Sequence, residues 1–173
     1  MPCPLRTTAT ATFESLALLL AEAMPADASS DVPLAHAMRV PFVDAAGATG
    51  ALVVAVSDDV AAALAANMLG VATARADAAA RSDALGELAN VVCGNVLPAV
   101  AGRAAVFHLG APAAIPLTEA LLALALASDA LRAELAVEAG RAALCLQLPA
   151  GLALRPSVDP VPMPHKASLD AMS

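Results

Sequence analysis

Residues 82–96 read SDALGELANVVCGNV, and apolar and polar residues in this run recur with the period of an α-helix. At about 100° per residue, one side of the helix collects apolar residues: Leu85, Leu88, Ala89, Val92 and Val96. The opposite side carries a stripe roughly 60° wide, made of Asp83, Glu87, Asn90 and Gly94. The pattern predicts a long helix over about residues 76–100 that packs one side on a core and turns this stripe outward.

The stripe costs the helix stability. Asp83 and Glu87 place like charges four residues apart, which disfavours a helix by a few tenths of a kcal/mol. Gly94 costs about 1 kcal/mol relative to Ala, in a chain that otherwise uses Ala freely. Solvation alone explains most polar helix faces, and a bend near the helix end is an equal account of Gly94. The alternative is that Gly94 lets another backbone approach this surface closely.

The surrounding chain supplies helices and strands in alternation. Residues 8–24 show helical spacing, residues 34–43 and 51–57 form a hairpin pattern, and a helix follows Ser57 and ends at Gly70. Further strands are predicted over residues 105–109, 131–137 and 142–148, whereas the apolar residues 117–128 suit a helix or a strand. The order predicts an α+β fold: a largely antiparallel β-sheet with long helices packed on one face.

Length and composition predict one domain over residues 1–150. After Pro149 the prolines cluster, so we expect residues 151–173 to form a disordered or loosely attached tail. The net charge of −7 and the lack of a basic cluster argue against nucleic-acid binding. Charged residues interrupt every apolar run before eighteen residues, which argues against membrane insertion and for a cytoplasmic protein.

The cysteines and histidines give no sign of a metal site. Cys3, Cys93 and Cys145 are widely spaced, and the three histidines are scattered. We therefore predict no metal ligands and no cofactor held by this chain. The cysteines read as two buried thiols and one loose terminal thiol.

The sequence of the polar stripe resembles a motif of a known protein family. The run Asp83-Ala-Leu-Gly-Glu87-Leu-Ala-Asn90-Val-Val-Cys-Gly94-Asn95 resembles the signature helix of the CheX/CheC/FliY chemotaxis phosphatases: Asp or Ser, three residues, Glu, two residues, Asn, then a Gly-Asn pair. That family also places a proline about twenty-two residues after the Asn, where this chain has Pro112. Two-site members repeat the Glu and Asn on their first helix. In this chain, the position three residues after Glu14, where the Asn would be needed, is Ala17. The resemblance is therefore to single-site CheX.

The resemblance implies dephosphorylation of a response regulator, a CheY-like receiver domain that carries an aspartyl phosphate. Glu87 and Asn90 are the implied catalytic residues: Asn90 orients the attacking water, and Glu87 reaches a lysine of the receiver. Asp83 and Gly94 are the implied partner-binding residues. The Mg²⁺ that this chemistry needs is expected on the receiver. Similarity to CheX also implies a homodimer.

Two other functions fit the sequence. A noncatalytic adaptor would bind a receiver or a flagellar switch component through the same helix without turnover. A carrier of small apolar ligands fits the Ala-rich composition and would need a sizeable empty apolar cavity.

Overall fold

The computed structural model describes residues 3–25, 30–70, 72, 75–138 and 140–152. The elements run in this order: α1 (Pro4–Ser15), β1 (Ala21–Ala23), β2 (His36–Asp44), β3 (Thr49–Val56), α2 (Asp58–Leu69), α3 (Ala78–Ala101), β4 (Phe107–Leu109), β5 (Ala113–Ala114), α4 (Leu117–Leu126), a 3-10 turn (Asp129–Leu131), β6 (Arg132–Val137) and β7 (Gly140–Gln147). The predicted division at residue 150 stays a prediction, because residues 153–173 lie outside the described part.

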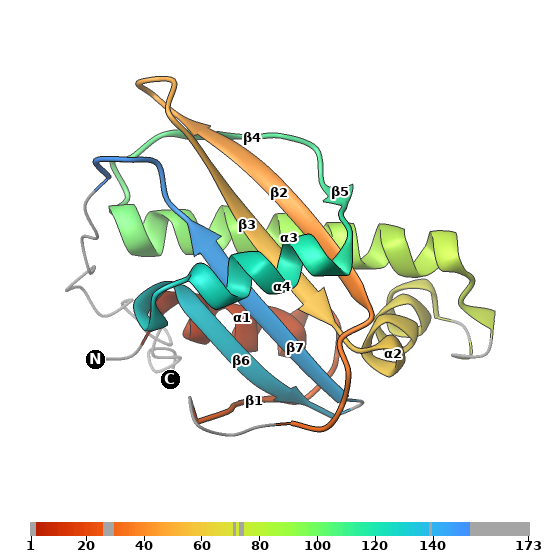
Figure 1. The fold of residues 1–173 in the computed structure, drawn as a ribbon. Helices are drawn as coiled ribbons and strands as arrows, with labels where there is room; N and C mark the ends of the chain where they lie inside the picture. Colours follow the sequence, from red (N-terminus) through yellow and green to blue (C-terminus); the bar gives the residue numbers. More distant parts are fainter. Residues whose placement is uncertain (1–2, 26–29, 71, 73–74, 139, 153–173) are drawn as a thin grey trace, which may run out of the picture.

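The strands form one antiparallel sheet in the order β1-β6-β7-β3-β2-β4, with β5 also paired to β2. The helices α1 and α3 lie side by side on one face, and the short α4 crosses the other (Figure 1). The predicted α+β fold, with its antiparallel sheet and long helices on one face, is therefore confirmed. Residues 117–128, whose pattern suited either a helix or a strand, contain the helix α4.

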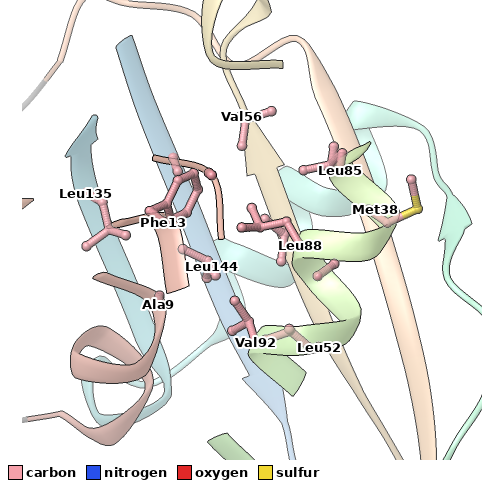
Figure 2. Packing of buried hydrophobic residues seen from close by; sticks show 14 of the residues in the cluster. Ala9, Phe13, Met38, Leu52, Val56, Leu85, Leu88, Val92, Leu135 and Leu144 are labelled. Atoms are coloured by element: carbon pink, nitrogen blue, oxygen red, sulfur yellow. The ribbon is translucent and has the colours of Figure 1, made fainter. Parts of the chain in front are cut away.

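The larger core lies between the sheet and the helices α1, α2 and α3. Phe13 of α1 and Leu88 of α3 point toward Leu144 of β7 in this layer (Figure 2). Alternate residues of the central strands face the opposite side, where α4 covers Val53, Ala55 and Cys145 with a smaller apolar cluster. The sheet is thus buried on both faces at its centre, which accounts for the Val-rich sequence of β3.

The first helix is shorter than its periodicity predicts. The helical spacing continues to Met24, but α1 ends at Ser15 and the chain turns at Leu18, whose φ is +54°. The backbone N–H of Leu19 donates to the carbonyl of Phe13 at 3.1 Å across this turn. Leu19 is buried after the turn, so its spacing imitates a continuing helix. The prediction of a helix to residue 24 was wrong for this reason.

The other predicted elements are found within a few residues of their expected ends. Helix α2 ends at Gly70, which has the left-handed conformation (φ +66°) expected of a helix-terminating glycine. Helix α3 begins after Asp77, whose side chain accepts a 2.8 Å hydrogen bond from the backbone N–H of Ala80. Of the described helices, only α3 is long and apolar enough to span a membrane, a test that core helices also pass.

Burial gives the folded protein a predictable response to alkali. It raises the pKa of the Cys93 thiol to about 12 and that of Cys145 to about 11, from an ordinary value of 9.0. Both thiols keep their protons in the folded protein above pH 9, whereas the unfolded chain loses them. The free energy of unfolding is therefore unaffected by these thiols below pH 9 and falls as the pH rises toward 11.

We predict a loss on the order of 1 kcal/mol per thiol at about pH 10, measured by urea unfolding. The chain has no tyrosine and only one lysine, Lys166, so few other groups titrate in this window. A variant with both Cys93→Ala and Cys145→Ala is the control and should lose most of the pH dependence. An unfolding free energy that stays constant up to pH 10 in the natural sequence would contradict the prediction.

Candidate functional site

The polar stripe of α3 faces outward, as its spacing predicts. The five predicted core residues Leu85, Leu88, Ala89, Val92 and Val96 are each no more than 1% exposed. Asp83, Glu87 and Gly94 are exposed, and Asn90 is half-buried. The burial of one side of α3 therefore fixes the opposite side as a surface.

The structure brings three of the four predicted site residues together in one groove. Asp83, Glu87 and Asn90 line an open hollow of about 300 Å³, whereas Gly94 lies one turn beyond it. The remaining lining residues are Met38, Ser82, Gly86, Pro112 and Ala114. The groove is therefore bounded by α3 on one side and by the chain around Pro112 and β5 on the other.

Gly86 explains how that chain comes so close to α3. A Cβ atom on Gly86 would lie 3.4 Å from Cβ of Pro112 and 3.8 Å from the methyl group of Met38. The backbone of α3 thus lies close to Pro112. A side chain larger than the methyl group of alanine at position 86 would push the helix and Pro112 apart. Sequence reasoning missed Gly86 as a site residue, although a glycine inside a helix of an Ala-rich chain was a visible signal.

Among the described residues, the acidic groups of the stripe have no cationic partner. In the described part of the chain, no ion pair or hydrogen bond engages the side chains of Asp83, Glu87 or Asn90. The described residues also contain no group of three or more His, Cys, Asp or Glu placed to hold a metal ion. The groove therefore offers two carboxylates and one carboxamide to an approaching molecule.

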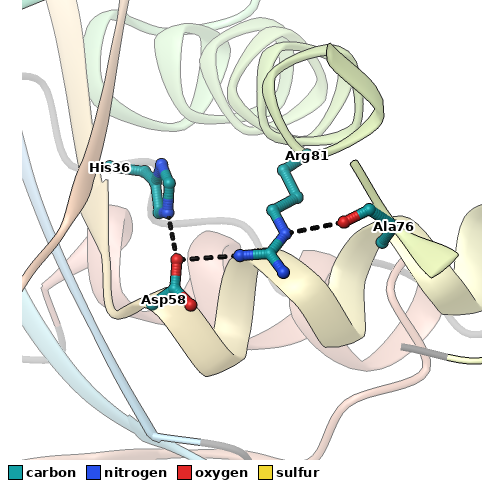
Figure 3. Close-up of polar contacts among 4 residues, drawn as sticks. All are labelled: His36, Asp58, Ala76 and Arg81. Carbon is teal, nitrogen blue, oxygen red and sulfur yellow. Dashed lines mark hydrogen bonds and ion pairs between the residues drawn. The ribbon is translucent and has the colours of Figure 1, made fainter. Parts of the chain in front are cut away.

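A charged network braces the start of α3 beside this groove. Arg81 donates at 2.8 Å to Asp58 at the start of α2 and at 2.9 Å to the carbonyl of Ala76 (Figure 3). Asp58 also lies 2.6 Å from Nε2 of His36, at the start of β2. The hydrogen bond with His36, and then that with Arg81, holds the pKa of Asp58 below its ordinary value of 3.8. Asp58 therefore stays ionised at neutral pH and keeps the Arg81 side chain engaged.

Comparison with known protein families gives one match. Residues 39–135 match the family described as chemotaxis phosphatase CheX, so the chain belongs to the CheX family. The match covers α3 and its whole polar stripe. No curated protein sequence matches the chain significantly.

Solved structures share the fold at low sequence identity. The CheX of Vibrio vulnificus has a TM-score of 0.62 at 16% identity, over 83% of this chain and 93% of its own. The CheX of Desulfovibrio desulfuricans has a TM-score of 0.57 at 17% identity, over 83% and 97%. A CheX–CheY–BeF₃–Mg²⁺ complex from Borrelia burgdorferi matches with a TM-score of 0.61 at 13% identity, over 83% and 94%. Each of these likenesses shows the fold.

Gly94 allows a test of whether the stripe sacrifices stability. A Cβ atom added to Gly94 would meet nothing within 4 Å, so Gly94→Ala should raise the free energy of unfolding by about 1 kcal/mol. Gly86→Ala is the comparison at a buried position of the same helix, where the new methyl group would lie in van der Waals contact with Pro112 instead of in open space. Urea unfolding measures both. A Gly94→Ala variant less stable than the natural protein would show that Gly94 is needed by the fold itself.

Proposed function

We propose that this protein dephosphorylates a CheY-like response regulator by inserting the outer side of α3 into the receiver's active site. The single observation that carries the proposal is the outward display of Glu87 and Asn90, three residues apart, on a helix whose other side is buried. Membership of the chemotaxis phosphatase CheX family supports the substrate class. The complex of a similar fold with CheY, BeF₃ and Mg²⁺ supports the kind of partner.

Asn90 orients the attacking water. The carboxamide both donates and accepts hydrogen bonds, so it can hold a water molecule in line with the phosphorus atom. The water oxygen forms the new bond to phosphorus as the bond to the aspartate carboxylate breaks, which yields free aspartate and inorganic phosphate. An acyl phosphate has a good leaving group, and the reaction is largely dissociative, so positioning supplies much of the acceleration without a strong base.

Glu87 anchors the partner. Its exposed carboxylate pairs with the receiver's active-site lysine once docking excludes bulk water, and this ion pair sets the register of the two proteins. Asp83, one turn earlier, adds a second negative charge, and Gly94 lets the partner backbone approach. The Mg²⁺ belongs to the receiver's carboxylates, and this chain contributes no cofactor.

The shape of α1 supports a proposal of one active site per chain. This helix ends at Ser15, before Ala17, and Ala17 is fully buried. A second Glu-Asn pair has no place there. We propose a cytoplasmic homodimer with one site in each protomer.

The hollows do not favour an apolar-ligand carrier. The groove at α3 is open and carries a polar rim, and another hollow, of about 60 Å³, is lined by Met24 and by charged residues of α1, the 3-10 turn and β6. Neither is an enclosed apolar chamber.

The first test is Asn90→Ala. This variant should release phosphate from a phosphorylated CheY-type receiver no faster than the receiver does alone, because water positioning is lost. Its unfolding should stay close to that of the natural protein, since Asn90 is only half-buried on the outer side of α3. Phosphate release at several receiver concentrations measures the effect. Full activity in Asn90→Ala would overturn the catalytic assignment, and receiver binding by the natural protein without release would identify an adaptor.

The second test is Glu87→Ala, which should weaken receiver binding as well as the rate. We expect the dissociation constant to rise by about tenfold or more, the effect of losing an ion pair shielded from solvent. Calorimetry with the receiver loaded with beryllofluoride and Mg²⁺ measures it. Asp59→Ala is the control, because Asp59 is also exposed but lies on α2, outside the groove. An unchanged dissociation constant for Glu87→Ala would remove its anchoring role.

A further inference from the structure

The groove beside the stripe has an apolar side that the catalytic roles of Glu87 and Asn90 do not use. Met38, Gly86, Pro112 and Ala114 contribute apolar surface, and Ser82, Asp83, Glu87 and Asn90 contribute the polar rim. Met38 is itself buried in the main core, so this apolar surface is anchored and does not collapse into the groove. An apolar surface next to two carboxylates is complementary to a ligand that has an apolar group beside a positive charge.

The charge around the groove further limits the kind of ligand that can bind there. The lining carries two carboxylates and no cation. The nearest arginine on α3, Arg81, has its side chain turned to Asp58 and to the carbonyl of Ala76 (Figure 3), so it does not neutralise this rim. A complementary partner therefore presents a cation to the rim and an uncharged group beside it.

We propose that the groove receives one aliphatic side chain of the docking receiver, next to the cation that pairs with Glu87. This inference rests on the proposed function and deepens it, because it names what the second wall of the site recognises. The wall formed by Pro112 and Ala114 then selects among receivers, whereas Asn90 performs the chemistry on whichever receiver docks.

The size and openness of the groove favour a protein side chain over a free small molecule. Its volume of about 300 Å³ stands at the lower end of the range of roughly 300–1,000 Å³ typical of small-molecule sites. Such sites enclose most of their ligand, whereas this groove is open along α3. A side chain delivered by a docked protein needs no enclosure, because the partner itself covers the open side.

The short strand β5 offers a matched pair of variants. Ala114 pairs with Met38 and lines the groove, whereas its neighbour Ala113 pairs with Arg39, whose side chain bonds Glu119 of α4 on the other face of the sheet. Both alanines are exposed. Ala114→Leu therefore fills the groove, and Ala113→Leu adds the same bulk on the opposite face.

The experiment measures binding and turnover separately, with a CheY-type receiver loaded with beryllofluoride and Mg²⁺ for binding and a phosphorylated receiver for turnover. Ala114→Leu should raise the dissociation constant by about tenfold or more, while Ala113→Leu leaves it within about twofold. The loss of phosphate release by Ala114→Leu should be greatest at low receiver concentration and should shrink as the receiver approaches saturation, because the substitution weakens docking and leaves the Asn90 side chain in place. Ser82→Leu fills the groove from the α3 side and should reproduce the loss if Ala114→Leu proves unstable.

The outcomes separate the two proposals. If Ala113→Leu, Ala114→Leu and Ser82→Leu all bind the receiver as tightly as the natural protein does, the groove does not receive a receiver side chain. The phosphatase assignment would still stand in that case. A natural protein that neither binds nor dephosphorylates receivers would overturn the proposed function and this inference with it. A self-association that Ala114→Leu abolishes, measured by sedimentation, would show a second copy of this chain in the groove and would also overturn the proposal.

Discussion

The packing of α3 against the sheet fixes every other property of the site. Leu88 and Val92 are fully buried, and each such side chain contributes about 1.5–3 kcal/mol to folding. A rotation of the helix by one residue, about 100°, would expose leucines and drive the Glu87 carboxylate toward the core. Burying that unpaired charge costs far more than the like-charge repulsion on the surface. The core thus holds Glu87 and Asn90 outward, and no hydrogen bond from the described residues to either side chain takes part.

The groove arises from a second constraint, the pairing of β2. One edge of β2 pairs with β3 along its length, and the other edge pairs with the two short strands β4 and β5. The chain between these short strands runs past α3, and Gly86 permits the approach of Pro112. A site wall is therefore built by segments far apart in sequence, one on a helix and one at the sheet edge.

These constraints explain which parts of the site could be predicted from sequence. The outward stripe follows from helical periodicity alone, because the burial of Leu85, Leu88 and Val92 leaves only one direction for Glu87. The apolar wall depends on the register of Met38 with Ala114, which no local pattern encodes. The end of α1 could not be predicted from local periodicity either. A left-handed turn at Leu18 returns Leu19 to the core at the spacing that a continuing helix would give. Local periodicity finds a helix face, whereas tertiary pairing decides what that face meets.

The contrast between α1 and α3 shows why α3 can present the candidate pair of residues and α1 cannot. Both pack on the same face of the sheet, so each has an outer side available in principle. Helix α1 has only twelve residues, and its carboxylate Glu14 lies within two residues of its end. The position three residues later, Ala17, has left the helix; it is buried, and its carbonyl accepts a 2.8 Å hydrogen bond from Asn67 of α2. A carboxylate and a carboxamide three residues apart share a surface only if the helix continues through both positions, and α1 ends two residues too early. Helix α3, with twenty-four residues, continues well beyond Glu87 and Asn90 in both directions.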